Sequence, residues 1–369
     1  MKVCFVAHDF NFFKLHISKL VAEISKDNEV VVVTDLESAL PGDLGELKLK
    51  KVHFEHLKKR ANKKIFDYFR YIYSLRSVVK KIKAERIFYT TLESSFFGSI
   101  ISQFRSSNKS FFVITGTGPE FFKKQFRYKV LRLFYFLIFK INLLKRNCFF
   151  IFQNSQDQDL FSRLGFIDLK LSMVIGGFGV KITNIKKVYK NSKITFCFAG
   201  RIVKSKGLIE LLEATSSLGK QYSNFKLIIA GPRVYGSTDS ISDVEFQPFL
   251  QSEFIEYAGN IGHDKMNEFY QKGDVFVLPS HREGLSKALL EAAANGMPLI
   301  TSDVPGCEEC IENNGYVVKV NDSNSLRKAI ETFIIDPSII KKFSNNSLEH
   351  IKKNYSLEVV AEAYTKLIN

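Results

Sequence analysis

Short apolar runs alternate with longer, more polar stretches along the entire chain, and this alternation restricts the fold more than any other feature. Runs that are apolar throughout are typical of parallel strands buried on both faces, and the stretches between them have the length of helices. Such a pattern predicts doubly wound α/β domains. The expected strands are residues 2–8, 29–35, 86–91, 109–116 and 148–154 in the first half, and 193–200, 225–231, 254–259, 274–280, 297–303 and 315–320 in the second.

The length of the chain predicts two domains, because 369 residues exceed what one ordinary core holds. Residues 179–193 are polar, rich in lysine and without periodicity, as an interdomain connection would be. We therefore expect one Rossmann-like domain at 1–180, a linker at 181–192 and a second Rossmann-like domain at 193–354. We expect residues 355–369 to form a helix that crosses back to the first domain.

The net charge of +15 is concentrated in the first half of the chain. Residues 1–180 contain 30 Lys and Arg against 16 Asp and Glu, whereas residues 181–369 contain 23 against 22. This asymmetry predicts that the first half faces an anionic partner, either a nucleic acid or a lipid surface. A general compositional bias toward Lys, Asn, Ile and Phe is the alternative explanation of the charge.

One stretch of the first half, residues 121–146, contains eight Lys or Arg and no acid. Its longest uncharged apolar run, 133–139, is too short to cross a bilayer, which takes about 20 residues. Basic residues around a body of Phe and Leu suit a helix that lies on an anionic membrane. The alternative is a buried helix with a solvated basic edge. The sequence contains no recognised nucleic-acid module, so nucleic acid is not the expected partner.

Two cations follow the expected strand at 193–200, in the stretch AGRIVKSKGLIELLEA. Arg201 and Lys206 lie in the loop, and Gly207 opens an amphipathic helix. The free N–H groups and the dipole of a helix N-terminus favour anions, and nearby cations add to this, so the loop suits a diphosphate. Ordinary solvated side chains are the alternative for this stretch taken alone.

Two glutamates eight positions apart follow the expected strand at 274–280, in HREGLSKALLEAAA. Glu283 lies in the loop, and the next helix is expected to begin near Ser286, which places Glu291 about one turn inside it. A carboxylate among apolar residues needs a partner or a function. Glu291 has the chemistry to accept two hydrogen bonds from a vicinal diol such as a ribose. An ion pair with a buried Lys or Arg is the alternative.

In their order and spacing, GRIVKSKG, HREGLSKALLEA and MPLITSDVPGCEE resemble the retaining glycosyltransferases of family 4, and the resemblance covers the whole second half. In the first half, VAHDFNFFKLHIS, VITGTGPEFF, FQNSQDQDLFSRLGF and VIGGFGV are similar to a bacterial subgroup that builds polysaccharides and lipid-linked oligosaccharides. The family implies the GT-B fold. This is an α/β architecture of two facing Rossmann-like domains, each with a doubly wound parallel sheet, and an interdomain cleft.

The resemblance also implies roles for individual residues. Arg201 and Lys206 would bind the donor diphosphate and, with Glu283, carry catalysis. Glu283 would also hold hydroxyls of the donor sugar, and Glu291 would hold the ribose. The other donor-site candidates are Gly284, Leu285 and Ser286 beside the sugar, and Asn260, Ile261 and Gly262 beside the base. The acceptor-side candidates, which follow the first and fourth strands, are His8, Asn11, His16, Thr115, Gly116, Thr117 and Gly118.

The chain departs from the wider family at three positions. Many members have a glycine pair after the first strand and a histidine after the fourth, where this chain has residues 9–13 and 115–118. Lys181 replaces an acidic residue that is common at the entry to the second domain. The first two differences concern the sugar and acceptor contacts, and the nucleotide site matches the family.

No metal or cofactor is expected. Asp157 and Asp159 have the D-x-D spacing by which a different glycosyltransferase fold holds a metal, but they begin a helix, where capping explains them better. Cys307 and Cys310 form a single C-x-x-C pair without the second pair that a structural zinc site needs. The five scattered cysteines indicate a reducing compartment.

We therefore expect a retaining enzyme that moves a hexose or an N-acetylhexosamine from a UDP-linked donor to a polyprenyl-diphosphate-linked saccharide. Its partners would be the nucleotide-sugar donor, the lipid-linked acceptor and an anionic membrane surface, with no nucleic acid. Its place would be cytoplasmic and peripheral, on the inner face of the cell membrane. A nucleotide-sugar epimerase of the same fold, or a non-catalytic basic protein that binds membrane or nucleic acid, remains the alternative.

Overall fold

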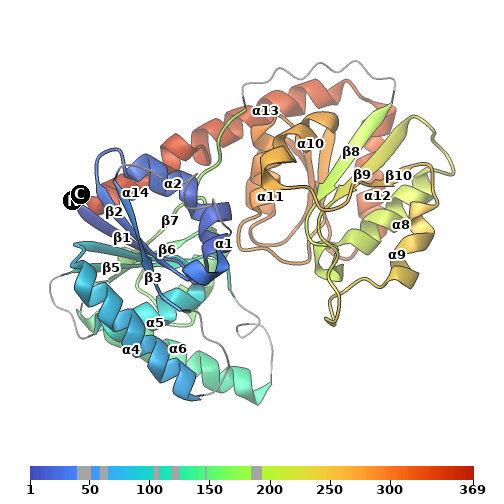
Figure 1. The fold of residues 1–369 in the computed structure, drawn as a ribbon. Coiled ribbons are helices and arrows are strands. Elements are labelled where there is room, and N and C mark those ends of the chain that lie inside the picture. The colour runs from blue at the N-terminus through green and yellow to red at the C-terminus, as the bar shows by residue number, and fades with distance from the viewer. Residues whose placement is uncertain are drawn as a thin grey trace. The chain divides into compact units, whose positions relative to one another are not determined.

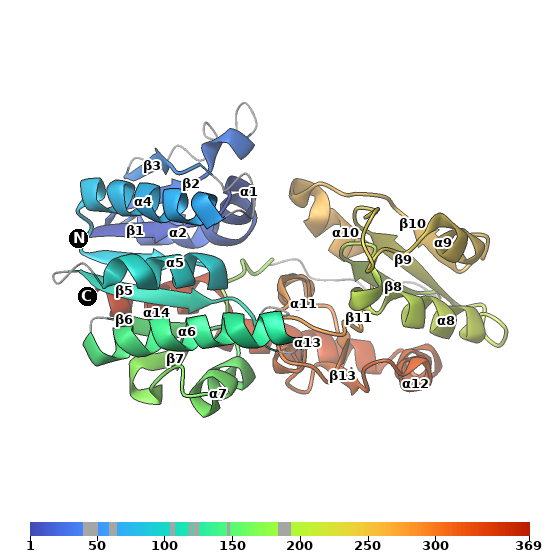
Figure 2. The same ribbon diagram turned by 90° about the horizontal axis from the view of Figure 1, so that it is seen from below.

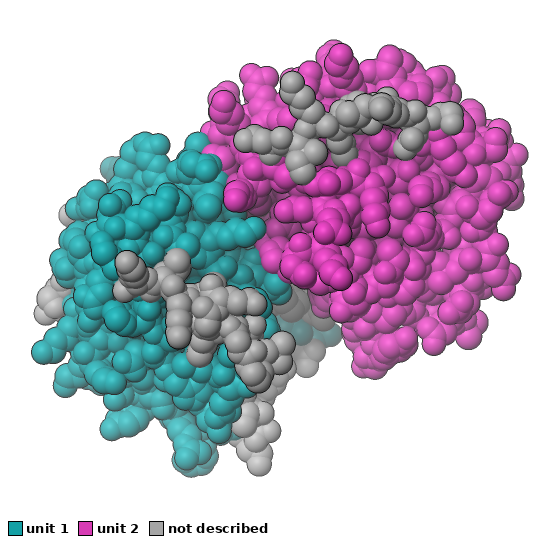
Figure 3. All heavy atoms as spheres, turned by 45° about the horizontal axis from the view of Figure 1, so that its top comes forward, with its two compact units in different colours: residues 1–179, 357–369 teal, residues 180–356 magenta. Residues whose placement is uncertain are grey.

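The computed structural model describes residues 1–39, 51–58, 65–103, 108–117, 121, 125–145, 148–183 and 193–369. These residues divide into two compact units, which Figure 3 distinguishes by colour. Unit 1 comprises Met1–Gly179 and Leu357–Asn369, and unit 2 comprises Val180–Ser356. Residues 184–192 of the expected linker and the acceptor-side candidate Gly118 lie outside the described residues.

Unit 1 is built on a seven-stranded sheet in the order β3-β2-β1-β4-β5-β6-β7, and every neighbouring pair is parallel. The five strands predicted from apolar runs form its centre. The sequence pattern does not predict the edge strands, because β3 is half-exposed along its length and β7 has only three residues. The strands are β1 (Lys2–Val6), β2 (Glu29–Thr34), β3 (Val52–His56), β4 (Arg86–Tyr89), β5 (Lys109–Ile114), β6 (Cys148–Phe152) and β7 (Ser172–Val174).

Helices cover both faces of this sheet (Figures 1 and 2). One face carries α4 (Ile65–Ile82), α5 (Leu92–Ser102), α6 (Phe126–Lys145) and α7 (Ser155–Arg163). The other carries α1 (Phe10–Phe12), the π-helical turn η1 (Phe13–Ile17), α2 (Ser18–Ile24) and α14 (Leu357–Ile368). Two short 3-10 turns, η2 (Leu36–Ser38) and η4 (Leu169–Leu171), complete the described elements of unit 1.

Helix α6, which lies in the basic stretch 121–146, has one buried side and one exposed side. Tyr135 and Phe139 are buried in the core of unit 1. The Asn142 amide also faces inward, where it donates a hydrogen bond to the Ser99 carbonyl of α5 at 2.8 Å. The opposite side of the helix exposes both apolar and basic side chains, among them Phe134 and Lys140.

The carboxyl-terminal helix α14 belongs to unit 1, although the whole of unit 2 precedes it in the sequence. Its Tyr364 ring lies 5.5 Å from Phe88, which stacks on Phe111 at 4.4 Å and on Phe5 at 5.0 Å. Phe5, Phe88 and Phe111 come from the adjacent strands β1, β4 and β5. Helix α14 therefore closes an aromatic core on the sheet of unit 1.

Unit 2 is built on a six-stranded sheet in the order β10-β9-β8-β11-β12-β13, again with every neighbouring pair parallel. All six strands were predicted from apolar runs, and the two parallel sheets confirm the expected α/β class. The strands are β8 (Ile194–Ala199), β9 (Phe225–Ala230), β10 (Ile255–Tyr257), β11 (Val275–Leu278), β12 (Leu299–Ser302) and β13 (Gly315–Val318).

The helices of unit 2 pack against this sheet in one continuous core. Three short 3-10 turns, η5 (Lys204–Lys206), η6 (His263–Lys265) and η7 (Glu308–Cys310), lie between the strands and helices. The helices are α8 (Leu208–Leu218), α9 (Asp243–Leu250), α10 (Met266–Lys272), α11 (Lys287–Ala294), α12 (Ser323–Ile335) and α13 (Ile339–Asn354).

The order of the strands in unit 2 reverses between β8 and β11. In open parallel sheets, ligands bind beyond the carboxyl ends of the strands, at the point where the strand order reverses. The loops that follow β8 and β11 are therefore the place in unit 2 where the topology predicts a binding site.

The hydroxyl of Tyr364 gives a test of the packing of α14. The side chain is fully buried, its hydroxyl has no hydrogen-bond partner within the described residues, and burial raises its pKa. Tyr364→Phe removes only this hydroxyl, so we expect the free energy of unfolding of unit 1 to stay the same or rise by about 1 kcal/mol. Tyr364→Ala deletes the ring and should lower it by about 3–5 kcal/mol.

Hydrogen exchange of the β1 and β4 amides, read by mass spectrometry across a denaturant series, would report unit 1 separately from unit 2. A loss of more than about 1 kcal/mol in Tyr364→Phe would contradict an unsatisfied hydroxyl.

Candidate functional site

The loop after β8 turns sharply to bring Lys206 against the loop after β11. Lys206 ends the 3-10 turn η5, and Gly207, with φ of +68°, connects it to α8. A Cβ atom at Gly207 would lie 1.9 Å from the carbonyl oxygen of Pro279, so only glycine permits this approach. The backbone N–H of His281 also donates to the Ser205 carbonyl at 2.9 Å. The two loops therefore form one structure at the reversal point of the sheet.

Lys206 and Glu283 form an ion pair across these loops, although they are 77 residues apart in the sequence. Their side chains are 19% and 14% exposed. Ser280 adds a hydrogen bond from its hydroxyl to Glu283 Oε1 at 2.9 Å. The structure thus brings together the predicted diphosphate cation and the predicted sugar carboxylate. Arg201 is exposed at the end of β8.

Glu291 lies on α11, which begins at Lys287 with Ser286 as its N-cap, as predicted. The carboxylate pairs with Lys287 at 3.0 Å and accepts a hydrogen bond from the Tyr270 hydroxyl at 3.3 Å. Burial, and next the charge of Glu291, raise the pKa of Tyr270 well above its usual value, which keeps this hydroxyl a donor. The ion pair that the sequence left open is therefore present, with a partner that is 25% exposed rather than buried.

A second charged pair, Glu210 with His281, joins α8 to the loop after β11. His281 Nε2 lies 2.9 Å from Glu210 Oε1. Burial alone would raise the pKa of Glu210, but hydrogen bonds from His281 and from its own backbone N–H outweigh this, and the net pKa is lowered. Sequence reasoning missed this pair: Glu210 and His281 lie in two separate quoted motifs, 71 residues apart, and neither motif alone indicates that they meet.

The loop after β12 supports the segment from Gly284 to Ser286. A Cβ atom at Gly306, whose φ is +74°, would lie 2.4 Å from the Gly284 carbonyl oxygen. The backbone N–H of Ser286 donates to the Gly306 carbonyl at 2.8 Å, and Glu309 accepts from the Gly306 N–H at 2.7 Å. Leu285, between these contacts, packs on the core of unit 2.

The predicted base loop, Asn260 to Gly262, follows β10. Asn260 and Gly262 are exposed, whereas Ile261 packs against the core. The loop lies at the same carboxyl edge of the sheet as Lys206. It is two strands away from the Lys206 loop, because β9 lies between β10 and β8.

In unit 1 the acceptor-side candidates form two groups at the carboxyl edge of the sheet. After β1, His8 pairs with Asp9 at 2.7 Å, and the Phe12 ring lies 5.0 Å from His8 and 4.8 Å from His16. Asn11 is exposed in α1, beside this cluster.

The second group follows β5, and β4 separates it from the first. Thr115 and Gly116 are partly exposed, and Gly116 has a φ of +132°. Thr117 is buried and donates a hydrogen bond to Asp157 at 3.0 Å.

Comparison with known proteins identifies the family. Residues 180–350 match the family described as glycosyl transferases group 1. Over its full length the chain is 25% identical to the N,N′-diacetylbacillosaminyl-diphospho-undecaprenol alpha-1,3-N-acetylgalactosaminyltransferase of Campylobacter jejuni, in an alignment that covers 100% of this chain and 98% of that relative. The chain belongs to the group 1 glycosyltransferases.

Two further comparisons agree with this assignment. The capsular polysaccharide biosynthesis glycosyltransferase CapM of Staphylococcus aureus is 27% identical over 181 residues, which is 48% of this chain and 47% of CapM. The structure of HepE from Anabaena, in complex with UDP and glucose, has a TM-score of 0.78 at 15% identity and covers 100% of this chain and 99% of HepE. The fold is GT-B, as predicted, and the chain is an enzyme of family 4.

The two motifs with a possible metal role have structural explanations in this glycosyltransferase. Asp157 is buried in the first turn of α7, which Asn154 caps, and Asp159 is exposed, so the two carboxylates point to different surroundings. Burial raises the pKa of the Cys307 thiol to about 12 and that of Cys310 well above its usual value. Within the described ranges, no group of three or more His, Cys, Asp or Glu is arranged to hold a metal ion.

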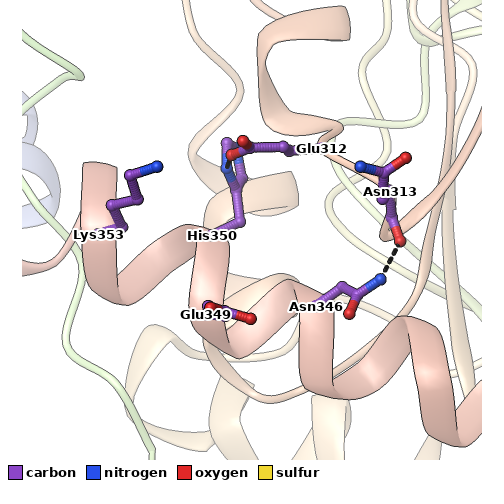
Figure 4. A pocket seen from close by; sticks show the side chains of 6 residues that line it. All are labelled: Glu312, Asn313, Asn346, Glu349, His350 and Lys353. Carbon is purple, nitrogen blue, oxygen red and sulfur yellow. Dashed lines mark hydrogen bonds and ion pairs between the residues drawn. The ribbon is translucent and has the colours of Figure 1, made fainter.

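A separate pocket lies between α13 and the segment that leads into β13 (Figure 4). Its polar groups largely satisfy one another, since His350 Nδ1 lies 2.5 Å from Glu312 and the Asn346 amide donates to the Asn313 carbonyl. Asn313 lies two residues before the start of β13, so the pocket adjoins the amino end of that strand. Arg201 and Lys206 follow the carboxyl end of β8 in the same parallel sheet, so the pocket is separate from the predicted donor site.

The close approach at Gly207 can be tested with a matched glycine. Gly236 has a similar φ of +74° but no atom within 4 Å of an added Cβ, so Gly236→Ala should cost only about 1–2 kcal/mol of backbone strain. Gly207→Ala carries the same strain and also collides with Pro279, so the η5 turn must move. We expect Gly207→Ala to abolish most transferase activity and to speed hydrogen exchange in residues 203–208. Similar activity in both variants would contradict the tight contact.

Proposed function

We propose that this glycosyltransferase moves a hexose or an N-acetylhexosamine, with retention, from a UDP-linked donor to a polyprenyl-diphosphate-linked saccharide in the synthesis of a cell-surface glycan. The pairing of Lys206 with Glu283, at the carboxyl ends of the neighbouring strands β8 and β11, carries the proposal. The name of the Campylobacter jejuni relative, which acts on a diphospho-undecaprenol-linked sugar, supports the acceptor class. The UDP in the HepE complex supports the donor class.

In this proposal Arg201 and Lys206 bind the donor diphosphate. As the bond to the sugar breaks, negative charge develops on the leaving diphosphate, and two cations beside the start of α8 stabilise it. This stabilisation needs no metal ion, so we propose a metal-independent reaction. The acceptor hydroxyl would attack from the face that the diphosphate leaves, and the family resemblance is the basis for this retention.

Glu283 and Glu291 have different roles in the proposal. Glu283 holds hydroxyls of the donor sugar, with the backbone at Gly284, Leu285 and Ser286 beside it. Glu291 holds the ribose, because its two hydrogen-bonded or ion-paired oxygens each keep a lone pair for a diol. The loop at 260–262 lies against the base.

We assign the acceptor to unit 1 and the donor to unit 2. The cluster of His8, Phe12 and His16 offers imidazole and ring surfaces suited to a saccharide. Asn11 is beside it, and Thr115, Gly116 and Thr117 follow β5 at the same edge of the sheet. The two groups together would contact the acceptor saccharide.

The outer face of α4 and α6 supports a position at an anionic membrane, on the cytoplasmic side where nucleotide sugars are made. On α4, Phe66, Phe69 and Tyr73 follow one stripe of the helix and are 83%, 66% and 77% exposed. On α6, a group of apolar side chains and a group of cations are exposed together. They are Phe126, Leu133, Phe134, Leu137 and Ile141 with Lys129 and Lys140.

Helices α4 and α6 flank α5 on one face of the sheet (Figure 2). Exposed apolar side chains beside cations are typical of a surface that lies in a lipid headgroup region. None of the described helices combines the length and the apolar character needed to cross a membrane.

The donor assignment predicts chelator-insensitive transfer. Purified protein would be assayed with a panel of UDP-hexoses and UDP-N-acetylhexosamines on a polyprenyl-diphosphate-linked saccharide, with and without EDTA. Lys206→Ala should lower kcat by about 100-fold or more, because the leaving diphosphate loses a cation. Lys220→Ala, an exposed cation just after α8, is the control. Loss of activity in EDTA that added metal restores would contradict metal independence.

The same assay separates the two glutamates. Glu291→Ala should weaken UDP binding in calorimetry, whereas Glu283→Ala should preserve UDP affinity and lower kcat, because removing Glu283 leaves Lys206 fully available to the diphosphate. An equal loss of UDP affinity in both variants would contradict this division of roles.

The membrane assignment predicts a loss of vesicle binding from either element of the surface. Replacing Phe66, Phe69 and Tyr73 with serine, or Lys129 and Lys140 with alanine, should reduce sedimentation with phosphatidylglycerol vesicles, and added salt should weaken binding of the wild type. Lys352 and Lys353 of α13, which are also exposed, serve as the control for the two lysines of α6. Unchanged sedimentation of both sets of variants would exclude this surface.

A further inference from the structure

The turn that carries Lys206 begins without a cap of its own. The N-cap position of η5 is Val203, whose side chain makes no capping hydrogen bond. The backbone N–H groups of Lys204 and Ser205 at the start of this turn therefore need acceptors from elsewhere.

Asp239 supplies these acceptors from a different loop, 34 residues farther along the chain. Its carbonyl accepts from the Lys204 N–H at 2.8 Å, and its carboxylate Oδ1 accepts from the Ser205 N–H at 2.8 Å. The second carboxylate oxygen accepts from the Ser205 hydroxyl at 2.5 Å. By accepting these three hydrogen bonds, Asp239 thus holds the two residues that directly precede Lys206.

The segment that contains Asp239 is itself fixed. It connects β9 to α9, and its backbone pairs with the β8 loop at Val203 and Ser240. The Asp239 N–H donates to the Ser237 hydroxyl at 3.1 Å. Arg233 holds the other end through the Ile241 carbonyl at 3.0 Å.

Ser205 also connects to the loop after β11, since its carbonyl accepts from the His281 N–H. Asp239, Ser205 and His281 therefore form a line of hydrogen bonds from the β9 loop to the loop that carries Glu283. The position of the Lys206 ammonium group depends on these hydrogen bonds. A lysine side chain is long and flexible, so the position of its backbone first determines where the ammonium group can lie.

We propose that Asp239 is a positioning residue for the donor site, which caps the η5 turn from outside and fixes Lys206 for the diphosphate. This inference rests on the proposed role of Lys206. Asp239 acts through hydrogen bonds rather than through its charge, since both of its carboxylate oxygens are engaged by Ser205.

The chemistry of Asp239 suggests two variants with opposite outcomes. Asp239→Asn keeps both contacts, because the amide oxygen accepts from the Ser205 N–H and the amide nitrogen donates to the Ser205 hydroxyl. We expect its affinity for UDP to stay within about twofold of the wild type. Asp239→Ala loses both side-chain contacts and should weaken UDP binding by about tenfold or more, raise the KM for the donor and lower kcat, though by less than Lys206→Ala does.

Asp322 provides a matched control in the same unit. Its carboxylate caps α12 by accepting from the Asn324 and Ser325 N–H groups, both at 3.0 Å. Asp322→Ala therefore removes a comparable pair of hydrogen bonds without touching η5. Calorimetry with UDP and steady-state kinetics would compare Asp239→Ala, Asp239→Asn and Asp322→Ala, with thermal unfolding of each variant measured alongside. If Asp239→Ala does not fold, Ser205→Ala removes only the hydroxyl contact and should give an intermediate loss of affinity.

A double-mutant cycle with Lys206→Ala completes the test. If Asp239 acts through Lys206, Asp239→Ala should have little further effect on UDP affinity in the Lys206→Ala background. Equal UDP affinity of Asp239→Ala and Asp322→Ala, or an Asp239→Asn variant as weak as Asp239→Ala, would overturn the proposal. If Lys206→Ala itself leaves UDP affinity unchanged, the proposed function fails before the question of Asp239 arises.

Discussion

The close contact between Gly207 and the Pro279 carbonyl is the constraint on which the proposed donor site depends. A side chain at Gly207 would collide with that carbonyl, so the absence of a Cβ atom lets the loops after β8 and β11 meet. The ion pair of Lys206 with Glu283 and the hydrogen bond from His281 to Ser205 both follow from this approach. Parallel pairing of β8 with β11 places the two loops at the same edge of the sheet, and glycine then allows the contact.

The charged residues of this edge occur as pairs that join separate segments. Lys206 with Glu283 and Glu210 with His281 each bridge two loops, and a partly buried carboxylate needs such a partner. In the proposed function a diphosphate competes with Glu283 for Lys206, and the sugar hydroxyls then provide the donors that Glu283 would otherwise lack. Binding affinity would therefore reflect an exchange of partners, and the diphosphate and the sugar would support each other's binding.

Most of the fold could be predicted from the sequence, because strands buried on both faces leave continuous apolar runs. The edge strands β3 and β7 leave no such run. In the proposed donor site, the candidates Lys206 and Glu283 could be identified because each lies in a local motif. Asp239 could not, because its function as a cap appears only when a loop 34 residues away lies beside η5. A local sequence motif can identify the residues that would contact a ligand. The residues that position those ligand-binding residues are identified only by tertiary contacts.

Net charge alone did not locate the proposed membrane surface of unit 1. A basic stretch predicts attraction to any anion, including nucleic acid, and α6 buries one side in the core. The exposed aromatic stripe of α4 distinguishes between these partners, because it shows that the surface is apolar as well as basic. Full burial of a large apolar side chain is worth about 1.5–3 kcal/mol, so several of them favour a partner with an apolar interior. On an anionic bilayer the cations would contact the headgroups and the apolar side chains would contact the acyl region. A nucleic acid would provide partners only for the cations.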